Sequence, residues 1–121
     1  MNLKGKIFNK INDREFNPKK AGYIRFIYCE VNEPRVCFPK PARSTYYILP
    51  RQSYILDRIV EGEEILPAEV SENYIEKNLN DIFANIEHIK ENVQESCRQC
   101  YLWLYHNNAT DRYSLAFCPV L

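Results

Sequence analysis

The feature that most constrains the fold is an apolar stripe within residues 75–93. Its members recur at spacings of four and three residues: Ile75, Leu79, Ile82, Ile86, Ile89 and Val93. This spacing places side chains on one side of an α-helix, and over this length it favours packing on a sheet rather than in a coiled coil. Ser71 is a candidate N-cap, and Glu72 places negative charge in the first turn. We therefore expect one long amphipathic helix from Ser71 to about Ser96.

Segments rich in aromatic and β-branched residues predict strands on both sides of this helix. The expected strands are residues 3–8, 23–31, 35–38, 44–49, 54–60, 100–105 and 113–118. The polar loop at residues 107–111 predicts a closing antiparallel hairpin, and the other short turns also favour antiparallel pairing. One helix covers one face of a sheet. The sequence thus predicts an α+β fold, with an antiparallel sheet of about five to seven strands and one long amphipathic helix packed on one face.

The length of the chain bounds its organisation. Residues 1–121 are expected to form a single domain, because 121 residues lie within the usual range of domain sizes.

The basic N-terminal segment is not followed by an apolar run of the length that a signal peptide needs. No run of residues approaches the length of a membrane span. The expected location is therefore the cytoplasm, without contact with a membrane.

The motifs of the common cofactor-binding classes are absent from the sequence. The chain has only three glycines, Gly5, Gly22 and Gly62. They fit neither of the glycine-rich patterns that bring backbone N–H groups close to phosphates. The sequence therefore predicts neither Walker-type nor dinucleotide binding, and no cofactor is expected.

The two halves of the chain carry opposite charges, although the whole has none. Residues 1–60 hold 12 basic and 5 acidic residues, a net charge of +7, whereas residues 61–121 hold 4 basic and 11 acidic residues, a net charge of −7. Within residues 61–95, ten acids are accompanied only by Lys77 and Lys90, a net charge of −8. The plain interpretation is a solvated helix face. The functional interpretation is an acidic docking surface that attracts a basic partner and repels nucleic acid.

The size, the acidic helix and the lack of catalytic motifs resemble the small cytoplasmic immunity proteins of bacterial toxin–immunity systems, including the contact-dependent inhibition type. The resemblance is one of general character without a shared motif, so it carries no site residue over. It implies a non-enzymatic protein that neutralises a cognate toxin, often a nuclease, by occluding its active or substrate-binding surface. The helix charges, with one tyrosine as a nearby anchor, predict the partner-binding residues Glu72, Tyr74, Glu76, Asp81, Glu87 and Glu91.

A first alternative is a module that binds single-stranded nucleic acid through the basic N-terminal half. Lys and Arg residues alternate there with Tyr and Phe, a composition that suits phosphate pairing and base stacking. The signature of an RNA recognition motif is absent, and the chain as a whole lacks the positive charge of a dedicated nucleic-acid binder. Nucleic acid is therefore a less favoured partner than a protein with a basic surface.

A second alternative is a zinc-supported accessory domain. Cys97 and Cys100 form a C-x-x-C pair, and Cys118 and His106 are weak candidates for further ligands. The odd total of five cysteines and the lack of a second such pair favour inert free thiols instead. A nucleophile pair of Cys118 with His106 has no supporting motif. We therefore expect no bound metal and no enzymatic activity.

Overall fold

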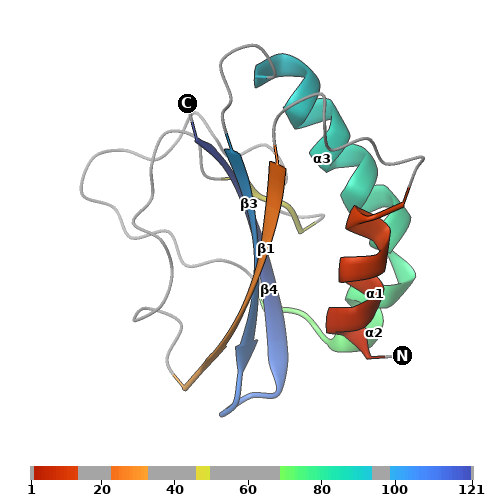
Figure 1. The fold of residues 1–121 in the computed structure, drawn as a ribbon. Coiled ribbons are helices and arrows are strands. Elements are labelled where there is room, and N and C mark those ends of the chain that lie inside the picture. Colours follow the sequence, from red (N-terminus) through yellow and green to blue (C-terminus); the bar gives the residue numbers. More distant parts are fainter. Residues whose placement is uncertain (1, 14–22, 33–45, 50–68, 94–98, 121) are drawn as a thin grey trace.

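The computed structural model describes residues 2–13, 23–32, 46–49, 69–93 and 99–120. The elements in these residues are α1 (Leu3–Ile11), β1 (Tyr23–Val31), β2 (Tyr46–Tyr47), α2 (Glu72–Lys77), α3 (Leu79–Val93), β3 (Gln99–Asn107) and β4 (Arg112–Val120). The helices lie on one side of the sheet (Figure 1). The predicted α+β class is confirmed, but its detailed architecture is not.

The sheet differs from the predicted one in size and in strand direction. Its strand order is β1-β3-β4-β2, with β1 parallel to β3 and the other neighbours antiparallel. Three strands of nine residues form most of it, and β2 adds two residues beside β4. The prediction of five to seven antiparallel strands is therefore wrong. Parallel pairing requires a crossover connection, and α2 and α3 lie in the chain between β1 and β3.

The first element of the chain is a helix, so the prediction of a strand at residues 3–8 is wrong. Asn2 caps this helix, because its Oδ1 accepts a hydrogen bond from the backbone N–H of Gly5 at 2.9 Å. Leu3, Ile7 and Ile11 are buried at intervals of four residues, which one side of a helix provides and a strand does not. The adjacent residues Ile7 and Phe8 favour a strand, but the N-cap and the four-residue spacing of the buried side chains favour a helix.

The predicted long helix is divided in two at Asn78, so the prediction of one continuous helix is also wrong. The expected N-cap is confirmed, since Oγ of Ser71 accepts a hydrogen bond from the N–H of Tyr74. Asn78 has φ −104° and ψ 12°, outside the helical region. Its side-chain Nδ2 donates to the carbonyl oxygen of Tyr74 at 2.8 Å, and such bonds compete with the helical pattern. Ile75, Leu79, Ile82, Ile86 and Ile89 of the apolar stripe still reach the core.

Several of the predicted strands are found in the structure. β1 has the predicted bounds, and β3 and β4 form the predicted antiparallel hairpin, each longer than expected at both ends. Of the strand expected at residues 44–49, residues 46–49 are described, and only Tyr46–Tyr47 of them form a strand, β2. The strands expected at residues 35–38 and 54–60 lie outside the described residues.

The main core fills the space between the helices and one face of the sheet. It combines buried side chains of the helices, alternate residues of β3 and β4, and two residues that follow β2: Leu3, Ile7, Ile11, Ile48, Leu49, Ile75, Ile82, Phe83, Ile86, Ile89, Cys100, Leu102, Leu104, Leu115 and Phe117. On the opposite face, Tyr105 and Ala116 form a smaller buried cluster with Trp103. Among the described residues, no helix is long and apolar enough to cross a membrane.

Candidate functional site

The predicted partner-binding residues are divided between two helices, and those on α2 are only partly turned to solvent. Glu72, Tyr74 and Glu76 are half-buried. Oε1 of Glu76 lies 3.2 Å from Nζ of Lys6 on α1, so its charge is balanced within the chain. Of the predicted acidic face, the α2 portion is therefore less negative than the sequence suggests.

On α3, the acidic side chains reach solvent and the lysine does not. Asp81 and Glu91 are exposed, and Glu87 is half-buried on the same helix. The single lysine of α3, Lys90, is 3% exposed and lies in the interior. All the acidic residues of α3 therefore reach solvent, whereas its basic residue does not. His88 is also exposed on this side.

The residues named as zinc-ligand candidates do not converge. Cys100 is buried on the helix-covered face of the sheet. Cys118 pairs with Tyr101 in the β3–β4 register, which places it on the opposite face. His106 lies near the other end of β3, and Cys97 is outside the described residues. This placement also separates the Cys118 thiol from the His106 imidazole. Within the described part of the chain, no cluster of three metal-ligating side chains is present.

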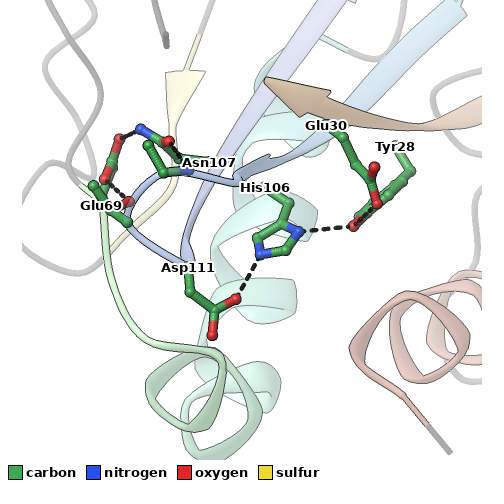
Figure 2. Close-up of polar contacts among 8 residues, drawn as sticks. Tyr28, Glu30, Glu69, His106, Asn107 and Asp111 are labelled. Atoms are coloured by element: carbon green, nitrogen blue, oxygen red, sulfur yellow. Dashed lines mark hydrogen bonds and ion pairs between the residues drawn. The ribbon is translucent and has the colours of Figure 1, made fainter. Parts of the chain in front are cut away.

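A polar cluster that the sequence did not predict lies at the hairpin end of the sheet (Figure 2). The imidazole of His106, on β3, lies between Tyr28 of β1 and Asp111 of the hairpin turn. Its Nε2 is 2.7 Å from Oδ1 of Asp111, and its Nδ1 is 3.2 Å from the hydroxyl of Tyr28. The same hydroxyl is 3.3 Å from Oε1 of Glu30. The imidazole also stacks on the ring of Tyr113, with 4.4 Å between centroids.

The contact with Asp111 favours one tautomer of His106. An ionised carboxylate only accepts, so the short contact with Asp111 assigns a hydrogen to Nε2 of His106. A neutral imidazole then has a lone pair on Nδ1, which is a second acceptor, beside Oε1 of Glu30, for the one hydrogen of the Tyr28 hydroxyl. Burial, followed by the charge of Glu30, raises the pKa of Tyr28 to about 12. Burial and the charge of Glu72 also raise the pKa of Tyr113. Both phenols are therefore neutral hydrogen-bond groups at ordinary pH.

The other side of the hairpin turn is held by Glu69 (Figure 2). Its two carboxylate oxygens accept hydrogen bonds from Nδ2 of Asn107 at 2.8 Å and from Oγ1 of Thr110 at 2.9 Å. Its carbonyl oxygen accepts from the guanidinium of Arg112, with Nη2 at 2.9 Å. The next residue, Val70, makes a backbone bridge to Tyr113. The carboxylate of Glu69, counted above with the acidic segment, is thus bound to residues of the hairpin.

Sequence reasoning named His106 as a weak metal-ligand candidate and as half of an unsupported nucleophile pair with Cys118, and it missed the partners of His106 in the structure. Glu30 and Asp111 were two acids among many, and Tyr28 was one of nine tyrosines. The position of Asp111 five residues after His106, across a turn-forming segment, is a local signal that was available. The contact with Tyr28 depends on the parallel pairing of β1 with β3, for which no local signal exists.

Both ring nitrogens of His106 are engaged, which limits the chemistry of this cluster. A general base needs a free nitrogen within reach of its substrate, so the imidazole must break a contact before it can take a proton from one. The arrangement instead links β1, β3 and the turn. Comparison with protein-family models, with curated proteins and with solved structures finds no match for this chain. Its function is therefore inferred from charge and geometry.

Proposed function

We propose that this protein is a non-enzymatic binding protein that docks a protein partner with a basic surface through the outer side of α3. The supporting observation is the distribution of charge on this helix: Asp81, Glu87 and Glu91 reach solvent, whereas Lys90 is 3% exposed. Negative charge gathered on one rigid element steers a basic surface into contact and raises the association rate.

The particular role that we favour is that of an immunity protein, which neutralises a cognate toxin by covering its active or substrate-binding surface. A nuclease binds the phosphates of its substrate with basic residues. An acidic helix competes for the same surface, because its carboxylates offer a similar pattern of negative charge. The resemblance in general character to toxin-neutralising proteins agrees with this role.

The three residues of α3 carry most of the proposed surface, with Glu72 and Tyr74 at its margin. Glu76 contributes less, since its partner Lys6 lies 3.2 Å away. The opposite charges of this partly buried ion pair largely cancel, so it has little net field to offer an approaching partner. The proposal therefore ranks the six predicted positions, with Asp81 and Glu91 first because both are exposed.

The experiment begins with affinity capture of a partner from the native source, followed by purification of the captured protein. Hydrogen exchange of the chain is then compared with and without that partner. We expect new protection in α3 and none in the hairpin turn at residues 108–111. Protection centred on the hairpin, with α3 unchanged, would contradict the proposed surface even though a partner had been found.

The alternative of nucleic-acid binding is favoured by one observation on the other face of the sheet. Arg25 is exposed there and pairs in register with Tyr101, which neighbours Trp103 on the same face. The rings of Tyr101 and Trp103 are 6.2 Å apart, and both are half-buried. A shift assay with mixed single-stranded DNA and RNA at low salt tests this alternative. Salt-dependent binding that Arg25→Glu abolishes would favour it over the acidic-face proposal.

A further inference from the structure

The hydroxyl of Tyr28 has two acceptors within reach and one hydrogen to give. Nδ1 of His106 lies 3.2 Å away, and Oε1 of Glu30 lies 3.3 Å away on the same strand. A phenolic oxygen donates one hydrogen bond and can accept others at the same time. The choice between the two acceptors therefore depends on whether Nδ1 itself carries a hydrogen.

The state of Nδ1 depends on the charge of the imidazole. The contact of 2.7 Å with Asp111 keeps a hydrogen on Nε2 in both charge states of the ring. When the ring is neutral, Nδ1 accepts the proton of Tyr28. When the ring takes one proton from solvent, Nδ1–H becomes a donor to the oxygen of Tyr28. The hydroxyl hydrogen of Tyr28 is then donated to the carboxylate of Glu30.

We propose that His106 is a proton-operated latch, in which protonation of the ring turns the Tyr28 hydroxyl from the imidazole to Glu30. The protonated state joins the hairpin turn, β3 and β1 through three hydrogen bonds, from His106 to Asp111, from His106 to Tyr28 and from Tyr28 to Glu30. Each of these involves a charged group, and such hydrogen bonds are stronger than neutral ones. The neutral state leaves Glu30 without the phenolic donor.

Most of the charged groups around the ring are acidic. The titratable groups around the cluster are Tyr28 and Glu30 on β1, Asp111 and Tyr113 on the hairpin, Glu72 on α2 and Lys4 on α1. Three of them are carboxylates. The single cation, Lys4, lies over the ring of Tyr28 with Nζ at 5.1 Å from its centroid, on a different group from the imidazole. Acidification thus tightens the link between the hairpin and β1.

Heteronuclear NMR of the whole chain tests this proposal directly. The ring-nitrogen shifts of His106 and the shift of the hydroxyl-bearing carbon of Tyr28 are followed from about pH 8 to about pH 5, where an ordinary histidine gains its proton. We expect protonated Nε2 and unprotonated Nδ1 at the upper end. As Nδ1 gains its proton, the Tyr28 carbon should shift with the same midpoint.

Two variants serve as matched controls. In Glu30→Ala the second acceptor is gone, so the Tyr28 shift that accompanies protonation should fall to less than about half of its wild-type size. Asp111→Gly removes the carboxylate but suits the backbone there, and it should populate both neutral tautomers of His106. The proposal is overturned if neutral His106 carries its hydrogen on Nδ1 in the unaltered protein, or if the Tyr28 carbon does not respond to protonation of the ring.

Discussion

Asp111 has a backbone φ of 53° and places its Oδ1 2.7 Å from Nε2 of His106. Among the described residues it is the single non-glycine residue with positive φ. Aspartate tolerates this left-handed conformation better than most residues, yet glycine adopts it without cost. The contact with the imidazole thus coincides with a strained turn position, and the two contributions can be separated by substitution.

Replacing Asp111 with glycine and with alanine separates the carboxylate from the backbone. Both variants lose the hydrogen bond with His106, whose exposed carboxylate partner makes it worth at most about 1 kcal/mol. Only Asp111→Ala retains a Cβ at positive φ, so it should be less stable than Asp111→Gly by about 1 kcal/mol. Urea denaturation of the two variants gives this difference. Equal stabilities would show that the turn does not hold a left-handed residue at this position.

Glu69 should contribute more to stability than an exposed acid on α3. Glu69→Ala removes the acceptor of the Asn107 amide, a residue that is only 6% exposed, and we expect a loss of about 1–3 kcal/mol in the free energy of unfolding. Glu91→Ala is the matched control and should change it by less than about 0.5 kcal/mol. Both values follow from denaturant midpoints. A loss in Glu69→Ala no larger than the control would mean that the hairpin does not depend on this carboxylate.

The packing of α1 predicts that substitutions at two adjacent residues have very different effects on the free energy of unfolding. Ile7 is 0% exposed and Phe8 is 56% exposed. Ile7→Ala should lower the free energy of unfolding by about 2–5 kcal/mol, because it removes buried methyl groups and leaves a cavity. Phe8→Ala should change it by about 0.5 kcal/mol or less. The reverse order of the two effects would contradict the burial of Ile7 and the exposure of Phe8.

The raised pKa of Tyr28 predicts a loss of stability in alkali. The folded state holds the phenolic proton up to a pKa of about 12, whereas the ordinary pKa of a tyrosine is 10.0. The contribution of this shift to the free energy of unfolding is thus complete below pH 10 and is lost as pH rises toward about 12. Because Tyr28 is partly exposed and solvent screens its interactions, the loss is at most about 2 kcal/mol. Tyr28→Phe has no proton to lose and should show a shallower decline over this range. Denaturation series at several alkaline pH values measure both slopes, and parallel slopes would contradict the prediction.

The parts of the fold that sequence predicted are those with local signals. The N-cap at Ser71 follows from residue type and position, and the hairpin follows from two β-rich segments around a polar loop. β1 followed from a run of aromatic and branched residues. Each of these signals lies within about ten residues of chain and does not depend on distant partners.

The parts that the sequence could not predict depend on competition between local structures or on contacts between residues far apart in the chain. At Asn78 a side-chain hydrogen bond competes with the helix, and the apolar stripe continues through the break without any change of spacing. At Leu3 and Ile7, a helix and a strand were both compatible with so short a segment. The contact between Tyr28 and His106 requires two strands to pair in parallel across a long intervening segment, which no local pattern encodes. The burial of Lys90 likewise depends on tertiary packing.

The association rate constant with the captured partner tests the central claim most directly. Asp81→Asn combined with Glu91→Gln raises the net charge by two, and Asn108→Lys combined with Ala109→Lys raises it equally on the exposed hairpin turn. At low salt the first pair should slow association about tenfold, an effect that salt diminishes, whereas the second should leave it within about twofold of the unaltered protein. Equal rates for the two double variants would contradict docking through the acidic outer side of α3.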